Sequence, residues 1–253
     1  MEYKCLVTNF VITGGTSGIG LEVSKKILSS GDRILIFSRN LEKFQQIKPI
    51  FESKKVESSF VQVDFENLVE YESLIEREIN NFENIDVLIN NVGASLKFDE
   101  NCSIEDYSRV ININLLSVHL MTKLSVNQML RNSIKGKIFT ISSMAALNLD
   151  GLLPYVTAKH AVDAYIRLSA KNLSGTGITH IGIRPGPVNV PGRFLTNLEL
   201  QNKDEFINWC RVHNYSPMKL CKMEDIAELI DIFIKTKNYF FNGSIINMSD
   251  GTL

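Results

Sequence analysis

Short apolar runs rich in β-branched residues alternate with longer amphipathic segments along this chain, and this alternation constrains its fold more than any other feature. Strands that alternate with helices form parallel sheets with right-handed crossovers. The runs are apolar throughout, as expected for strands that helices cover on both faces of a sheet. The predicted strands are Leu6–Thr13, Arg33–Phe37, Ser59–Val63, Val87–Asn90, Lys137–Ser142, Thr179–Arg184 and Ser244–Met248.

The predicted helices lie between these strands. In the segment Ile19–Ser29, apolar residues recur every four positions and so share one helix face, and Gly31 follows as a candidate C-cap. The other predicted helices are Glu66–Asn80, Ser103–Asn132, Pro154–Leu173 and Met223–Lys235. No repeat or low-complexity linker divides the 253 residues. We therefore predict a single α/β domain over residues 1–253, with a doubly wound parallel sheet and helices on both faces.

A glycine-rich turn, residues 13–20 with the sequence TGGTSGIG, joins the first predicted strand to the first helix. Glycine accepts positive φ and lets the backbone approach a ligand closely. The helix start offers free N–H groups and the positive end of a dipole, which suit a pyrophosphate. In doubly wound sheets, ligands bind at this end of the strands. The alternative is a glycine-rich turn that binds no ligand.

The spacing of Gly14, Gly18 and Gly20 is GxxxGxG, which resembles the short-chain dehydrogenase/reductase family and differs from the general GxGxxG fingerprint. Other motifs extend the resemblance over almost the whole chain. Residues 90–93 (NNVG) resemble the family's NNAG motif, residues 155–159 (YVTAK) its YxxxK motif, residues 184–188 (RPGPV) its PG motif, and Gly243 with Asp250 and Gly251 its last strand and closing turn. The resemblance implies a Rossmann-like fold and an oxidoreductase that moves a hydride between nicotinamide and a carbonyl or alcohol carbon of a small molecule.

The resemblance also implies a cofactor site at the strand ends. Asp64 resembles the family residue that accepts a hydrogen bond from the adenine amino group, and it could also cap the helix that follows. Asn90 and Gly93 are expected to shape the wall of the cofactor cleft. The expected cofactor-binding residues are Gly14, Thr16, Ser17, Gly18, Ile19, Gly20, Ser38, Arg39, Asp64, Phe65, Asn91, Gly93, Tyr155, Lys159, Pro185, Gly186 and Val188.

The residues after the second predicted strand bear on the choice between the two nicotinamide cofactors. Enzymes that prefer NAD usually place Asp or Glu there to bind the ribose 2′-hydroxyl. This chain has Ser38 and Arg39 instead, and an arginine can bind a 2′-phosphate with two parallel hydrogen bonds. We therefore predict NADP(H), with NAD(H) less favoured. Ser17 is not basic, which suggests a moderate preference, and the alternative for Arg39 is a solvated surface residue.

The pair Tyr155 and Lys159 predicts acid–base chemistry. Hydride delivery to a carbonyl builds negative charge on oxygen, so the site must supply a proton. Tyrosine can do so if its pKa falls below the usual value of about 10, which a nearby cation and the positive nicotinamide ring favour. Lys159 follows Tyr155 by four residues, which places both on one helix face. A second YxxxK, Tyr215 to Lys219, contains Pro217 and is interpreted as coincidence.

Two more side chains complete the expected catalytic group, which is Asn114, Ser143, Tyr155 and Lys159. The family serine that binds the substrate oxygen usually precedes the tyrosine by thirteen residues, a spacing that Ser142 has, whereas Ser143 precedes it by twelve. We favour Ser143 because family members with this Ser-Ser pair use the second serine. Asn114 resembles the family asparagine that holds a water linked to the lysine, and its alternative role is a local backbone hydrogen bond.

One position departs from the family pattern. The family commonly has a threonine that contacts the nicotinamide carboxamide where this chain has Val190. Val188 could still bind the carboxamide through its backbone, and Asn189 or Thr196 could replace the threonine. This departure supports the alternative function, which is a non-catalytic NADP(H)-binding regulatory or sensing protein of the same fold.

Residues 189–222 are expected to form a lid over the substrate, as the equivalent segment does in the family. Four leucines between Ser143 and Tyr155 predict a partly apolar pocket, unless they pack against a neighbouring subunit; they are Leu147, Leu149, Leu152 and Leu153. Family members pair the helices that resemble Ser103–Asn132 and Pro154–Leu173 across subunits. We therefore expect a homotetramer, with a dimer as the second choice.

Composition argues against several other classes of protein. The net charge is −1 and no run of Lys and Arg occurs, which disfavours nucleic acid and anionic membrane surfaces. No apolar stretch is long enough to cross a bilayer, and residues 1–10 lack the pattern of a signal peptide. The four cysteines are scattered without metal-ligand spacing; they are Cys5, Cys102, Cys210 and Cys221. We therefore expect no metal, no nucleic-acid or membrane partner, and a cytoplasmic protein with free thiols.

Overall fold

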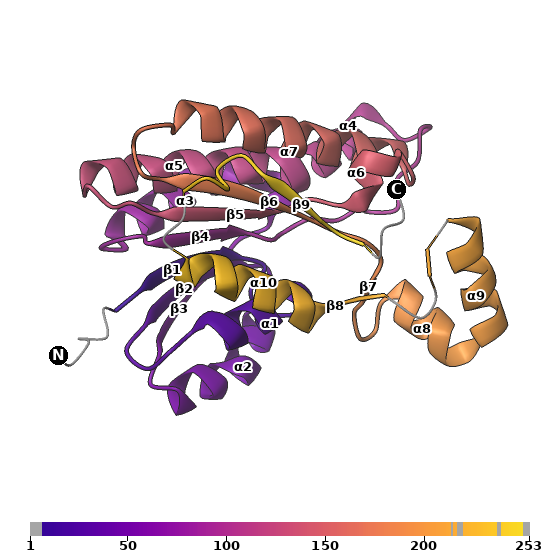
Figure 1. The fold of residues 1–253 in the computed structure, drawn as a ribbon, viewed down its shortest axis with the longest axis horizontal. Helices are drawn as coiled ribbons and strands as arrows, with labels where there is room; N and C mark the ends of the chain where they lie inside the picture. Colours follow the sequence, from indigo (N-terminus) through magenta and orange to yellow (C-terminus); the bar gives the residue numbers. More distant parts are fainter. Residues whose placement is uncertain (1–6, 214, 217–219, 237–238, 250–253) are drawn as a thin grey trace.

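A computed structural model describes residues 7–213, 215–216, 220–236 and 239–249. Its centre is a seven-stranded parallel sheet with the order β3-β2-β1-β4-β5-β6-β9 (Figure 1). The strand order reverses direction between β1 and β4, which makes the carboxyl ends of these two strands the expected ligand crevice. The strands are β1 Asn9–Thr13, β2 Arg33–Ser38, β3 Glu57–Gln62, β4 Val87–Asn90, β5 Lys137–Ile141, β6 Thr179–Pro185 and β9 Ile245–Met248.

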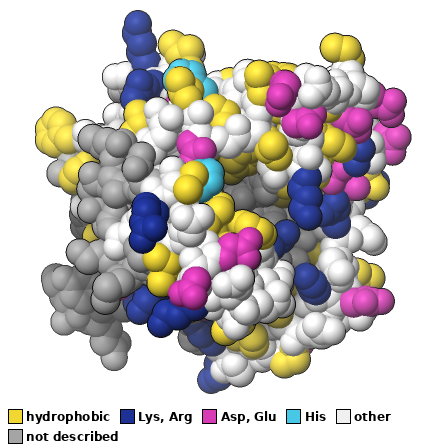
Figure 2. All heavy atoms as spheres, turned by 90° about the vertical axis from the view of Figure 1, so that its right-hand side faces the viewer, with side chains coloured by type: hydrophobic (Ala, Val, Ile, Leu, Met, Phe, Trp, Pro, Cys, Tyr) yellow, Lys and Arg dark blue, Asp and Glu magenta, His cyan; other side chains and the backbone are white. Residues whose placement is uncertain are grey.

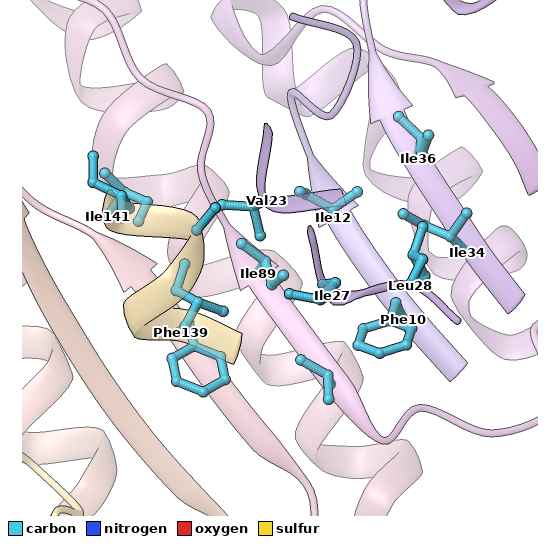
Figure 3. Close-up of a cluster of buried hydrophobic side chains, with 14 of the residues drawn as sticks. Phe10, Ile12, Val23, Ile27, Leu28, Ile34, Ile36, Ile89, Phe139 and Ile141 are labelled. Carbon is cyan, nitrogen blue, oxygen red and sulfur yellow. The ribbon is translucent and has the colours of Figure 1, made fainter. Parts of the chain in front are cut away.

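Helices cover both faces of the sheet, as Figure 1 shows. One face packs against α1 Gly18–Ile27, α2 Leu41–Ser53 and α10 Met223–Lys235. Figure 3 shows this layer, in which Val23 and Ile27 of α1 meet Ile12 of β1 and Ile89 of β4. The other face packs against α3 Leu68–Asn81, α5 Ser117–Arg131 and α7 Leu153–Asn172. The predicted doubly wound fold is confirmed, and the predicted strands all form.

The outer strand β3 differs from the prediction of strands buried on both faces. Its residues Glu57, Ser59 and Gln62 are exposed, and Val61 is its one buried residue. The reason is its place at the edge of the sheet, where α2 packs on one face and solvent reaches the other. The central strands β1 and β4 are buried at every residue.

Three helix predictions need correction. The segment predicted as one helix from Ser103 to Asn132 is α4 Ile104–Ile111, a π-helical turn Asn112–Leu116 and α5. Helix α1 ends at a C-cap on Leu28, so Gly31 with φ +93° belongs to the following turn. Helix α2 was not predicted, because Pro49 inside it obscured an apolar face at helical spacing.

The expected lid leaves the sheet after β6 (Figure 1). It contains the strands β7 Val188–Asn189 and β8 Cys221–Lys222, which pair in parallel, and the helices α8 Phe194–Gln201 and α9 Lys203–Val212. Helix α8 has no buried residue, and α8 and α9 project beyond the carboxyl edge of the sheet. The motif residues Asp250 and Gly251, and Pro217 and Lys219 of the second YxxxK, lie outside the described residues.

Candidate active site

The glycine-rich turn is tightly packed where it leaves β1. Gly14 and Gly18 have φ of +69° and +55°, which side chains disfavour. A Cβ on Gly20 would lie 2.4 Å from the Gly14 carbonyl oxygen, so only glycine fits there. Ser17 is the N-cap of α1, and its side chain makes no capping hydrogen bond within the described structure. The first N–H groups of α1 therefore stay available to an anion.

Neighbouring strand ends hold this turn in place. The Asn91 amide nitrogen donates to the carbonyl oxygens of Thr13 and Gly14 at 3.0 and 3.2 Å. The Thr16 and Ser38 hydroxyls are 2.9 Å apart, which joins the turn to the end of β2. Ile19 packs on the core of the α1 side. These contacts preform the turn before any ligand binds.

Asp64, Phe65 and Arg39 lie at the ends of β3 and β2. Asp64 caps the 3₁₀ turn Phe65–Asn67 by accepting a hydrogen bond from the Glu66 N–H at 3.1 Å, so the capping role predicted for it is present. The Phe65 side chain is buried in the core, which leaves only its backbone to a ligand. Arg39 is half exposed but not merely solvated, because its Nη1 donates to Glu66 Oε1 at 2.7 Å.

The two serines at the end of β5 lie in different surroundings. Ser142 is buried, and its hydroxyl donates to Asp163 at 2.6 Å. The same carboxylate accepts a hydrogen bond from Arg184 Nε at 2.8 Å. Ser143 caps the short helix α6 Met144–Asn148, and its side chain lies close enough to the Tyr155 phenol to lower the pKa of that group. The structure therefore places Ser143, and not Ser142, beside the tyrosine.

Lys159 is almost fully buried, 3% exposed, below the Tyr155 ring. Its Nζ lies 5.8 Å from the ring centroid and donates to the Ile141 carbonyl at 2.9 Å. Burial lowers the pKa of Lys159 to about 8, although the nearby Asp163 opposes the shift. Burial also raises the pKa of Tyr155, and the nearby Ser143 side chain offsets this only in part. The predicted fall of the tyrosine pKa is therefore not present in the protein alone.

Asn114 and Lys159 meet at Gly93. A Cβ on Gly93 would lie 2.8 Å from Asn114 Oδ1 and 2.9 Å from Lys159 Nζ, so the space beside the lysine depends on this glycine. Asn114 accepts a hydrogen bond from the Ala94 N–H at 3.2 Å and donates to the Ala94 carbonyl at 2.7 Å. It also donates to the Val110 carbonyl at 2.9 Å, which is the local backbone bond predicted as its alternative role. The π-helical turn holds the side chain in this position.

The PG motif closes the other side of the site. The Gly186 N–H donates to the Met248 carbonyl at 3.0 Å, so Pro185 and Gly186 are tied to β9. Val190 packs toward the glycine-rich turn, since its Cγ1 would lie 3.5 Å from a Cβ on Gly18. The Thr196 hydroxyl lies 2.6 Å from both Asn189 Oδ1 and the Val190 carbonyl. Asn189 and Thr196, which could replace the threonine missing at position 190, are therefore hydrogen-bonded to each other.

Sequence reasoning missed two features of the site. Glu66 and Arg109 form an ion pair beside Arg39. The two residues are 43 positions apart in the sequence, so no local sequence pattern predicts their contact. His213, at the end of α9, forms a 2.8 Å contact with Asp150 in the loop between α6 and α7. This contact joins the end of α9 to the loop that lies between Ser143 and Tyr155 in the sequence.

These residues fit a dinucleotide. The start of α1 offers N–H groups, glycines at 14, 18 and 20 shape the tight turn before it, and Arg39 lies at the end of β2. No group of three or more His, Cys, Asp or Glu side chains among the described residues could hold a metal ion. In the same part of the chain, no helix has the length and apolar character needed to cross a membrane. On the face that Figure 2 shows, Lys and Arg side chains are interspersed with Asp and Glu.

Known proteins resemble this chain in sequence. The sequence profile of short chain dehydrogenases matches residues 8–199. A fatty acyl-CoA reductase from Acinetobacter baylyi is 31% identical over 169 residues, which are 64% of this chain and 57% of that protein. A mitochondrial borneol dehydrogenase from Lavandula x intermedia is 26% identical over 246 residues, which are 95% of this chain and 88% of that protein.

Solved structures share the fold over nearly the full length. An L-sorbose reductase from Gluconobacter frateurii, solved with NADPH and L-sorbose, matches with a TM-score of 0.84 at 20% identity, covering 98% of this chain and 97% of that one. An NAD⁺-bound xylitol dehydrogenase matches with a TM-score of 0.83 at 21% identity, covering 96% and 98%. At these identities the likeness concerns the fold.

Proposed function

The chain belongs to the short-chain dehydrogenase family, and we propose that it is an NADP(H)-dependent oxidoreductase that transfers a hydride between nicotinamide and a carbonyl or alcohol carbon of a small molecule. The observation that carries this proposal is the meeting of Ser143, Tyr155 and Lys159 at the end of β5, with Asn114 beside the lysine. These are the groups that proton transfer to a carbonyl oxygen requires.

The nicotinamide cofactor supplies or accepts the hydride when it is bound. The N–H groups at the start of α1 would hold the pyrophosphate of the cofactor. The closely packed glycines would let the protein backbone approach that pyrophosphate. Asp64, Phe65, Asn91 and Val188 line the strand ends around this path.

Tyr155 gives a proton to the substrate oxygen during reduction and takes it back during oxidation. Ser143, whose side chain lies near the Tyr155 phenol, would hold that oxygen next to it. Charged Lys159 stabilises the phenolate, and its pKa of about 8 keeps most of it protonated at neutral pH. Asn114 fixes the backbone at Ala94 next to the ammonium group, where a water could carry protons to solvent.

The preference for NADP(H) rests on Arg39. No carboxylate occupies the end of β2 itself, and the half-exposed guanidinium can turn free N–H groups toward a 2′-phosphate. Proteins of this fold bind either cofactor, as the NADPH-bound L-sorbose reductase and the NAD⁺-bound xylitol dehydrogenase illustrate. The choice therefore depends on this chain's own residues.

The first experiment is a fluorescence titration of the purified protein with NADPH and NADH, followed by a carbonyl panel with the nucleotide that binds. We expect tighter binding of NADPH and its oxidation by at least one carbonyl compound. Tyr155→Phe should bind NADPH like the wild type and lose turnover by at least about a thousandfold, because the proton donor is missing. Full activity of Tyr155→Phe would overturn the catalytic assignment, and binding without turnover over a broad panel would favour the regulatory alternative.

A further inference from the structure

A buried carboxylate bridges two arginines beside the expected 2′-phosphate position. Glu66 Oε1 accepts a hydrogen bond from Arg39 Nη1 at 2.7 Å, and its Oε2 accepts one from Arg109 Nη2, also at 2.7 Å. The Glu66 side chain is 7% exposed, whereas that of Arg39 is 57% exposed. The cation proposed to bind the cofactor is therefore engaged by a carboxylate that is shielded from water.

The position of Glu66 is fixed from several directions. Its N–H donates to Asp64, and its carbonyl accepts a hydrogen bond from Asn112 at 2.8 Å. Arg109, the second partner, is itself held by Asp106 at 3.0 Å and stacks over Phe98. The backbone of Glu66 is thus bonded to the π-helical turn, and its carboxylate cannot turn away from Arg39 without breaking its contact with Arg109 of α4.

NADPH and NADH differ only in the 2′-phosphate, so their relative affinity reports the local charge. An arginine paired with a carboxylate attracts a phosphate less than a free arginine does, because the two charges partly cancel. The same pairing holds the guanidinium in one orientation, which reduces the entropy lost on binding. The first effect weakens NADPH binding and the second strengthens it. Both change the affinity for NADH very little.

We propose that Glu66 is a specificity-determining positioning residue, which fixes Arg39 at the end of β2 and limits how strongly the protein prefers NADPH over NADH. This inference rests on the proposed function, because it needs a nicotinamide cofactor that lies against Arg39. Arg109 acts in the opposite sense to Glu66. It shares the carboxylate with Arg39, so its loss would concentrate the negative charge on Arg39.

The test compares the dissociation constants of NADPH and NADH in two variants by fluorescence titration. In Glu66→Gln, NADPH should bind about five- to tenfold more tightly, the size expected when one unit charge is removed several ångströms from a phosphate. NADH binding should stay within about twofold. Glu70→Gln is the matched control, since it removes an exposed carboxylate one turn away, and it should leave both constants unchanged.

Arg109→Gln should weaken NADPH binding and again spare NADH, so the two variants shift the NADPH-to-NADH ratio in opposite directions. General structural damage would instead change the dissociation constants of both nucleotides, and it would do so in the same direction in both variants. If Glu66→Gln does not fold, as thermal unfolding would reveal, Arg109→Gln carries the test, because Arg109 is partly exposed. In an Arg39→Ala background, the effect of Glu66→Gln should shrink, because Glu66 acts largely through Arg39.

The outcomes separate this inference from the proposed function. A wild-type protein that binds neither nucleotide would overturn the proposed function and the inference with it. A protein that binds both nucleotides, but whose ratio stays within about twofold of the wild type in both variants, would overturn the inference alone. Weaker NADPH binding by Glu66→Gln would also overturn it, because Glu66 would then strengthen the preference for NADPH instead of limiting it.

Discussion

At the residue scale, Ser142 and Ser143 have neighbouring positions and different partners. Ser142 completes a buried group with Asp163 and Arg184, whereas Ser143 contacts Tyr155. A buried carboxylate that loses a hydrogen-bond donor destabilises the fold. A serine beside the reacting oxygen affects turnover instead.

Alanine substitution should separate the two roles. Ser143→Ala should lower kcat by about a hundredfold or more with little change in the free energy of unfolding. Ser142→Ala should lower the free energy of unfolding by about 1–3 kcal/mol and change kcat only a few-fold. Urea unfolding and steady-state kinetics measure the two quantities. The reverse pattern would move the substrate-binding role to Ser142.

At the element scale, the end of α9 joins the segment of residues 189–222 to the loop between α6 and α7. His213 contacts Asp150 and also stacks on Trp209, with ring centroids 4.4 Å apart. Tyr215 also stacks on the indole, with ring centroids 6.0 Å apart. Trp209 is the one tryptophan of the chain, so its emission reports the state of the lid.

His213→Ala should release this end of α9 from Asp150 and expose the Trp209 indole to water. We expect a shift of the emission maximum to longer wavelengths and faster proteolysis within residues 189–222. His119→Ala is the control, because His119 lies on α5 and contacts Tyr165. An unchanged spectrum and cleavage rate in His213→Ala would show that the histidine does not hold the lid.

Elements with a strong local pattern could be predicted from sequence, and those set by distant contacts could not. The buried runs of β1 and β4 and the periodicity of α1 were sufficient to place these elements. The π-helical turn escaped prediction because it depends on Asn114 bonding to Ala94, twenty positions away. The motif residues could be found from their spacing. The hydrogen bond from Arg39 to Glu66 could not, because the two residues are 27 positions apart in the sequence.

At the scale of the whole molecule, a chain of buried polar side chains crosses the sheet. Asn90 of β4 donates to the Thr140 hydroxyl of β5 at 3.1 Å, and that hydroxyl lies 2.8 Å from His180 Nε2 of β6. His180 Nδ1 lies 3.0 Å from the Ser169 hydroxyl of α7. Burial lowers the pKa of His180 to about 3, so the imidazole is neutral in the folded protein.

This histidine should make the fold sensitive to acid. The unfolded chain protonates it near pH 6.5 and the folded chain only near pH 3, so stability is complete above pH 6.5 and declines as the pH falls. Between pH 6.5 and 4.5 the loss from this residue is about 2 kcal/mol. His180→Gln should lose correspondingly less stability over that range in urea unfolding. Equal losses in the variant and the wild type would contradict the assignment.

The parallel pairing of β7 with β8 also bears on how this molecule can change. Val188 pairs with Cys221 and Asn189 with Lys222, so residues 190–220 leave and rejoin the body of the protein at one place. Insertions, deletions or a complete replacement between these fixed ends would not shift the register of any strand in the main sheet. The segment can therefore change in sequence and length while the residues around Tyr155 keep their geometry.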